Sequence, residues 1–277
     1  MIRKTSAFLA AAVALGGCSN LSTDLPALQP ISIVTVRSVP NAASPTGFTG
    51  KAFAYFFSER GFSYGDSRLA SNTCVGPTAL NTAGSSPSQW LDPGTPVTFA
   101  LRGASGVAPR STQLVTSAPG ETDAHVYTNV SVPTLYPGAD TATITVPGAA
   151  GGFPALSVTG ATVEDFTFDP VPDSSTGSGG LPIRWSAATH PNSAMEVDLV
   201  YKSSATATAL DTQIICTLVD DGEFSVPRQF LDGWQLAGDD SQPLSHEIRY
   251  TRYLTSAATA GDASILLINT LDKKQVK

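Results

Sequence analysis

The sequence predicts an all-β protein made of two β-sandwich domains in tandem. Gly and Pro are frequent, with 24 and 20 copies in 277 residues, and they separate short runs rich in Val, Ile and Thr. Several of these runs alternate apolar and polar side chains, as strands with one buried face do. A hydrophobic content of 42% is enough to build buried cores.

The N-terminal domain is expected between residues 30 and 157. Strands are predicted there where β-branched or aromatic runs lie between turn residues. The predicted strands are Ile31 to Val36, Lys51 to Phe57, Val97 to Leu101, Thr112 to Val115, His125 to Val130 and Thr141 to Val146. Pro93–Gly94 and Pro137–Gly138 each precede a strand, where a type II turn favours that pair.

The C-terminal domain, residues 158 to 277, shows the clearer pattern. Leu181 to Trp185 and Met195 to Tyr201 alternate strictly, so each presents one apolar face. Further strands are predicted at 165–169, 212–219, 223–226, 245–254 and 263–271, followed by a solvated tail from residue 272. Pro227 and Gly233 are expected to begin and end a short helix. Its apolar face (Phe230, Leu231 and Trp234) should cap the core.

A Leu-x-Ile-x-Trp strand ending at Trp185, followed by a Val-x-Leu-x-Tyr strand ending at Tyr201, resembles an immunoglobulin or fibronectin type III sandwich. The resemblance covers roughly residues 160 to 272. It implies two antiparallel sheets packed face to face around Trp185. The cysteine pair of antibody domains is missing, because the strand before Trp185 contains no cysteine.

The first 18 residues predict export and lipidation. A basic pair followed by an apolar run from Ala7 to Leu15 has the layout of a secretory signal, and the run is too short to span a bilayer. The ending Leu-Gly-Gly-Cys18 resembles the lipobox of bacterial lipoproteins, in which the chain is cut before a cysteine that then carries lipid. This resemblance implies a signal peptide over residues 1–17, palmitate-type lipidation of Cys18, and a tether over residues 18–29.

The same resemblance implies a location. Ser19, rather than Asp, follows the cysteine, which in Gram-negative lipoproteins implies sorting to the outer membrane. A lipobox followed by two β domains is similar to lipoproteins of Gram-negative bacteria that have no assigned chemistry. Whether the protein faces the periplasm or the cell surface, and in what oligomeric state, stays open.

Two cysteines remain once Cys18 is assigned to lipid. Cys74 and Cys216 can pair in an oxidising compartment, and a disulfide between them would join the two halves of the chain. Cys216 can equally serve as a small core residue of an apolar strand. Both alternatives stay open at this point.

Composition and motif searches argue against several functions. A net charge of -7 does not suit a nucleic-acid partner, which needs a basic face. His125, His190 and His246 are scattered, without a nucleophile elbow or metal-ligand spacing. The acidic turns 220–222 and 238–240 lack calcium-loop spacing and are expected to be solvated. We therefore predict no catalytic residue, no metal and no cofactor.

Three functions remain under consideration. The first is a membrane-anchored envelope lipoprotein that acts, without catalysis, as a binding or structural module for an envelope protein or a polysaccharide. The second is a carbohydrate-binding surface module, in which Phe53, Tyr55, Phe57 and Trp90 would supply stacking rings. The same rings could instead form core, and their full burial would count against sugar binding. The third is a hydrolase whose site the sequence does not reveal.

Overall fold

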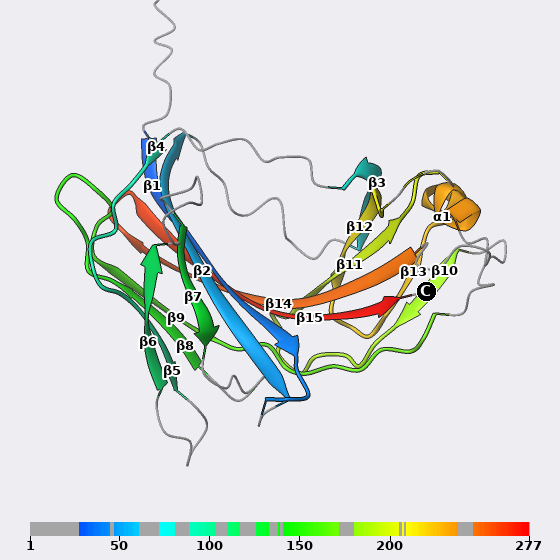
Figure 1. Ribbon diagram of the computed structural model, residues 1–277, viewed down its shortest axis with the longest axis horizontal. Helices are drawn as coiled ribbons and strands as arrows, with labels where there is room; N and C mark the ends of the chain where they lie inside the picture. The colour runs from blue at the N-terminus through cyan, green and yellow to red at the C-terminus, as the bar shows by residue number, and fades with distance from the viewer. Residues whose placement is uncertain are drawn as a thin grey trace, which may run out of the picture.

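The computed structural model shows an all-β protein whose strands form two lobes joined by long shared strands (Figure 1). The structure describes residues 28–44, 47–60, 72–80, 89–102, 110–116, 126–132, 138, 141–171, 180–204, 207, 209–237 and 246–276. The predicted signal peptide, Cys18 and most of the tether lie outside these residues, as does His125. In the part of the chain that the structure describes, no helix is both long and apolar enough to cross a membrane.

The described residues of the N-terminal half form nine strands. They are β1 (Leu28–Pro40), β2 (Phe48–Arg60), β3 (Thr73–Ala79), β4 (Gln89–Trp90), β5 (Val97–Arg102), β6 (Arg110–Thr116), β7 (Val126–Val132), β8 (Thr141–Val146) and β9 (Leu156–Ala161). The C-terminal half supplies β10 (Leu181–Arg184), β11 (Ala194–Tyr201), β12 (Thr212–Val219), β13 (Glu223–Val226), β14 (His246–Ala260) and β15 (Ala263–Val276). A 3-10 helix, η1 (Arg228–Phe230), and a short helix, α1 (Asp232–Ala237), lie between β13 and β14.

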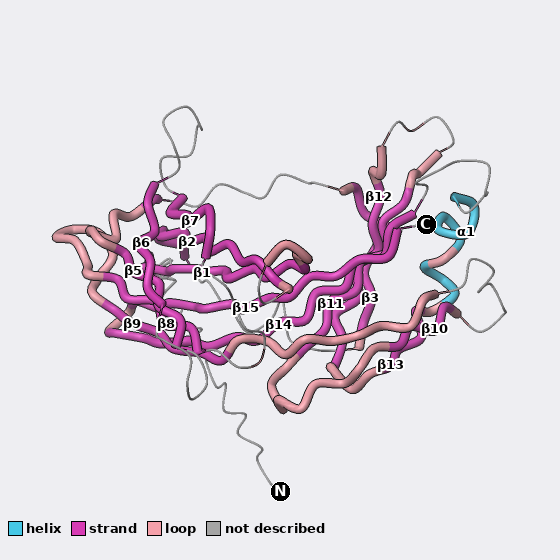
Figure 2. The backbone as a smooth tube through the Cα atoms, turned by 60° about the horizontal axis from the view of Figure 1, so that its bottom comes forward, coloured by secondary structure: helices cyan, strands magenta, loops and turns pink. Residues whose placement is uncertain are grey.

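One sheet of 13 strands runs through the described parts of both halves, in the order β3-β12-β11-β14-β15-β1-β2-β7-β6-β5-β8-β9, with β4 beside β2. The pairing of β1 with β15 is parallel, whereas the other pairings in this sheet are antiparallel. β10 and β13 form a separate two-stranded sheet. Figure 2 shows β14 and β15 extending from one lobe into the other.

Two hydrophobic cores lie on the same face of the β14–β15 hairpin. The N-terminal core contains Phe56, Phe99 and Ile144 and also receives Ile265 and Leu267 from β15. The C-terminal core is built around Trp185, Val197, Leu199, Cys216 and Tyr250, together with Leu271 of β15. Because residues of one face alternate along a strand, these cores define an inner face of the long sheet, and we call the opposite side its outer face. The cores share a hairpin, and the division into two domains near residue 157 stays a prediction.

A second link between the halves comes from β3. This strand precedes most of the N-terminal strands in sequence, yet it pairs with β12. Cys74 and Cys216 lie opposite each other in that pairing and are joined by a disulfide across 142 residues of sequence. The disulfide therefore connects a segment of the N-terminal half to the C-terminal core.

The alternating strands of the C-terminal half are confirmed. Leu181, Ile183 and Trp185 are buried on one face, as are Val197 and Leu199. The strand expected at residues 165–169 is wrong, because within that segment only Phe168 makes a β-bridge, to Trp185. The predicted solvated tail is also wrong, since β15 continues to Val276 and pairs with β14 over its whole length.

The short helix after Pro227 is confirmed in part. Leu231 and Trp234 are buried in the C-terminal core as expected. Gly233 does not end the helix but lies inside α1, close to its start at Asp232. The glycine has a packing role here, because a Cβ atom at this position would lie 2.6 Å from the Tyr201 hydroxyl oxygen.

Candidate functional site

Two of the histidines singled out in the sequence, His190 and His246, are described, and each makes a contact within the protein. His246 is buried, with Nε2 2.8 Å from the Trp234 carbonyl oxygen. His190 lies in a loop, where its Nδ1 accepts a hydrogen bond of 3.2 Å from the Asn192 N–H. Among the described residues, no group of three or more His, Cys, Asp or Glu side chains is placed to hold a metal ion.

The aromatic row of β2 lies on the outer face of the sheet. Its neighbours Ala52, Ala54 and Phe56 occupy the inner face and belong to the N-terminal core. Phe57 is buried, with its ring centroid 6.3 Å from that of Trp90 in an edge-to-face contact, while Phe53 and Tyr55 are half-buried. The row therefore lacks three open rings in line, which a flat sugar platform would need.

A groove opens where β1 and β15 separate. The two strands pair in parallel from Ile31 with Ser264 to Ser38 with Leu271. After this point β1 continues beside β2 to Pro40, whereas β15 continues beside β14 to Val276. The resulting groove has a volume of about 860 Å³.

Charged side chains dominate the lining of this groove. The described lining consists of Arg37, Val39, Pro40, Phe168, Glu247, Arg249, Thr251, Asp272, Lys273 and Lys274. Four of these residues are cationic and two are acidic, in a chain whose overall charge is -7. We call this feature the cationic groove.

Cross-strand pairing places most of these charges on the outer face. Arg249 lies opposite Lys274, and Thr251 lies opposite Asp272, in the β14–β15 ladder. Side chains that are directly opposite on one face interact, so the ladder brings the charges of the two strands together. Arg37 reaches the same region from β1 through an ion pair with Asp272.

Glu247 is the acidic centre of the groove. Its carboxylate lies 2.5 Å from Nε of Arg249 and 3.0 Å from Nζ of Lys274, and the side chain is 10% exposed. Burial alone would raise the pKa of Glu247, but the hydrogen bonds and charges of Arg249 and Lys274 outweigh burial and hold this pKa below its ordinary value. The carboxylate is therefore ionised at neutral pH and orients both cations.

On the other side of β15, the strand is held by residues 162–171, which cross the C-terminal core and which we call the crossing segment. Nζ of Lys273 forms an ion pair of 2.6 Å with Asp165 and also donates to the Phe166 carbonyl. The Gln275 side chain accepts from the Val171 N–H at 3.0 Å and donates to the Val171 carbonyl at 3.2 Å. These contacts fix the position of the last residues of β15, which form one wall of the groove.

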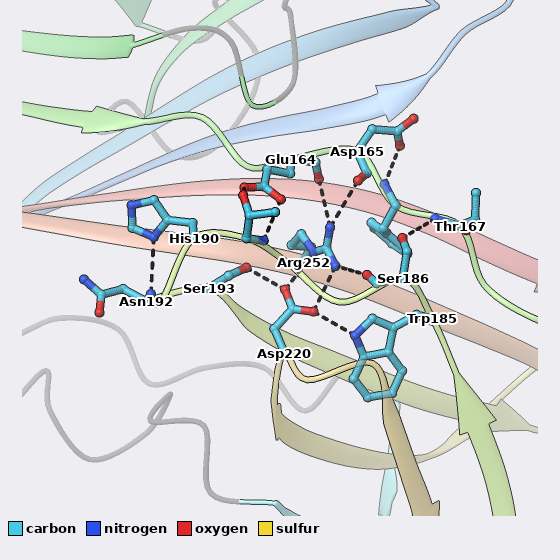
Figure 3. A network of polar contacts seen from close by, with 12 residues as sticks. Glu164, Asp165, Thr167, Trp185, Ser186, His190, Asn192, Ser193, Asp220 and Arg252 are labelled. Carbon is cyan, nitrogen blue, oxygen red and sulfur yellow. Dashed lines mark hydrogen bonds and ion pairs between the residues drawn. The ribbon is translucent and has the colours of Figure 1, made fainter.

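The crossing segment is in turn anchored by a buried ion pair, shown in Figure 3. Arg252 donates to the carbonyl oxygens of Asp165 and Ser186 and lies 2.7 Å from Asp220. Asp220 also accepts from Nε1 of Trp185 at 2.7 Å and from Oγ of Ser193 at 2.6 Å. The sequence predicted a solvated turn at Asp220, which is wrong because these donors compensate its burial.

Glu164 makes a further link at the surface of this network. It accepts hydrogen bonds from the Thr189 N–H at 2.9 Å and from the Thr189 hydroxyl at 2.5 Å. These two bonds are the main reason why the pKa of Glu164 lies below its ordinary value. The contacts hold the loop that contains His190 against the crossing segment, which is a structural role.

Sequence reasoning missed the cationic groove because its residues come from four separate segments of the chain. The sequence predicts a solvated tail at Asp272, Lys273 and Lys274, because three consecutive charged residues show no alternation of buried and exposed side chains. The alternation of Glu247, Arg249 and Thr251 with buried Ile248 and Tyr250 was the available signal, since it marks a strand with a charged outer face.

Comparison of the sequence with models of known protein families gives no match, and a search of curated proteins gives no significant match either.

Proposed function

We propose that the protein is a membrane-anchored, non-enzymatic binding module of the bacterial cell envelope, and that the cationic groove is its binding surface. The observation that carries this proposal is the gathering of four cations around a groove of about 860 Å³ in a chain with a net charge of -7. Such a local reversal of charge favours an anionic ligand by electrostatic complementarity.

The exposed cations of the groove keep hydrogen-bond donors that a ligand can use. The side chains of Arg37 and Lys274 are 58% and 60% exposed. Arg37 and Arg249 each use Nε for their ion pair, and their Nη atoms make no hydrogen bond within the described part of the chain. Because a guanidinium carries five N–H donors in a planar fork, the free Nη edges suit carboxylate or phosphate oxygens.

The position of the predicted lipid agrees with this role. β1 begins at Leu28, ten residues after Cys18, and reaches the groove at its other end, Arg37–Pro40 (Figure 1). A strand rises about 3.3 Å per residue, so the 13 residues of β1 span roughly 40 Å. A lipid on Cys18 would attach to the end of β1 away from the groove and leave the groove accessible to a ligand.

Anchoring is tested by a Cys18→Ala variant of the full-length protein in its native cell. The wild type should fractionate with membranes and incorporate a palmitate analogue, and the variant should do neither. Unchanged membrane retention and labelling of the variant would overturn lipid anchoring.

The binding surface is tested in the same cells with a photo-reactive phenylalanine analogue. At Thr251, in the groove, the analogue should give discrete adducts that disappear when Arg37 and Lys274 are both changed to Gln. At exposed Pro182, on β10, it serves as the matched control and should give none. Three outcomes would overturn the groove as the binding surface. They are the absence of adducts at position 251, equal adducts at positions 251 and 182, and adducts at position 251 that persist when both cations are replaced.

A further inference from the structure

The backbone edge of β15 is open along the cationic groove. β1 covers this edge only as far as Leu271, and the residues from Asp272 to Val276 have β14 as their strand partner on the other side. No described strand pairs with the edge that β1 leaves. An uncovered edge presents N–H and C=O groups that can accept another strand.

Uncovered edges are often protected by lysine side chains that project into solvent. Lys274 is 60% exposed at this edge, but its Nζ is paired with Glu247 of β14. Lys273 does not project into solvent. It is folded back onto the crossing segment, paired with Asp165 and in contact with the Phe166 carbonyl, and is 17% exposed. Its Nζ also lies 5.0 Å from the centre of the Phe166 ring. β1 leaves this edge after Ser38 and ends at Pro40, which has no N–H to donate to a further strand pairing.

We propose that the groove binds an acidic peptide in extended conformation, which adds as a strand to the edge of β15 at Asp272–Val276. This inference rests on the proposed function and names the ligand class of the same groove. Five residues of edge at about 3.3 Å each give roughly 17 Å, which is an ordinary strand length.

The two kinds of lining side chain fit the two faces of such a peptide. Successive side chains of a strand point to opposite faces. Acidic side chains at every second position would meet the exposed cations Arg37, Arg249 and Lys274 of the outer face. The intervening side chains would meet the apolar lining on the inner side, Pro40 and Phe168. Main-chain hydrogen bonds would give affinity, and the alternating charges would give specificity, as in other cases of strand addition.

The test measures binding of fluorescein-labelled peptides to the full-length protein in detergent, by fluorescence anisotropy. The main probe is a seven-residue peptide in which glutamate alternates with valine. Its charge control has lysine in place of every glutamate.

Two further probes test strand pairing. They keep the glutamates but carry N-methyl groups on either the odd or the even backbone nitrogens. In a strand, alternate N–H groups point to opposite edges, so only one of these two sets blocks pairing with β15.

The acidic peptide should bind and the lysine peptide should not. One N-methylated peptide should bind at least ten-fold more weakly, because it loses two or more hydrogen bonds, while the other keeps its affinity. Arg37→Gln and Lys274→Gln should each weaken binding about two- to five-fold, as expected for exposed charge pairs. Arg184→Gln, an exposed arginine on β10, is the matched control and should leave binding unchanged.

Equal binding of the two N-methylated peptides would overturn strand addition, whatever their affinity. Displacement of the acidic peptide by polygalacturonate, together with such equal binding, would identify a site for anionic polymers in general, which overturns the peptide inference but keeps the proposed function. Absence of binding by every peptide would overturn the inference as well. Crosslinking from position 251 in cells would then decide the proposed function independently.

Discussion

Arg252 and Asp220 form an ion pair that lies entirely inside the C-terminal core. Nε of Arg252 is 2.7 Å from Oδ2 of Asp220, and each side chain is 1% exposed. The removal of both charges from water is compensated by hydrogen bonds from neighbouring segments, including those that Trp185 and Ser193 donate to Asp220. Because Arg252 also donates to the Asp165 carbonyl oxygen, it joins β14 to the crossing segment that supports the cationic groove.

Replacing Arg252 by Met should lower the free energy of unfolding by about 3–5 kcal/mol, since it leaves the Asp220 carboxylate buried without its partner. Urea unfolding followed by tryptophan fluorescence measures this loss. The matched control is Arg184→Met, whose ion pair with Glu223 is 3.8 Å long and exposed. It should cost less than about 1 kcal/mol. Similar losses for the two variants would contradict a special role for the buried pair.

The strands around this pair could be predicted because their burial is periodic. Leu181, Ile183 and Trp185 alternate with exposed residues, and so the sequence marks both the strand and its inner face. The same reasoning failed at Asp220. A carboxylate two residues before Gly222 is typical of an exposed turn, and only the three-dimensional position of Arg252 explains the burial of Asp220.

The groove shows a second limit of sequence reasoning. The parallel pairing of β1 with β15 joins strands near opposite ends of the described chain. No local signal specifies which distant strands become neighbours, because alternation determines the face of a strand and not its partner. The departure of β1 at Ser38, which opens the groove, was therefore not predictable from the sequence.

The disulfide between Cys74 and Cys216 should stabilise the protein by restricting the unfolded chain. A variant with Ala at both positions should lose about 2–5 kcal/mol of unfolding free energy, because the disulfide closes a loop of 142 residues. Urea unfolding with and without reductant measures this loss. Reductant should destabilise the wild type and leave the double variant unchanged. A reductant effect of equal size in both proteins would contradict the assignment.

The close approach of Tyr201 should make glycine necessary at position 233. A Cβ atom at position 233 would lie 2.6 Å from the Tyr201 hydroxyl oxygen, so Gly233→Ala should destabilise the protein by about 1–3 kcal/mol despite the better helix propensity of Ala. In a Tyr201→Phe background the contacting oxygen is gone, and the cost of Gly233→Ala should be smaller. A double-mutant cycle measured by urea unfolding gives this coupling. A cost that is the same in both backgrounds would exclude the contact as its cause.

Glu247 should make the stability of the protein sensitive to acid. Its folded-state pKa is below the ordinary value of 4.5, so the carboxylate binds protons more readily in the unfolded chain. Its contribution to the free energy of unfolding is therefore fully present above about pH 4.5 and is lost as the pH falls through the lowered folded-state pKa.

We expect the difference in unfolding free energy between the wild type and Glu247→Gln to be constant from pH 7 to pH 5.5 and to shrink towards zero in stronger acid. Urea midpoints measured between pH 3 and pH 7 test this, with Glu223→Gln as a control on a carboxylate whose side chain is 75% exposed. A difference that stays constant over the whole range would mean that Glu247 acts through packing rather than through its charge.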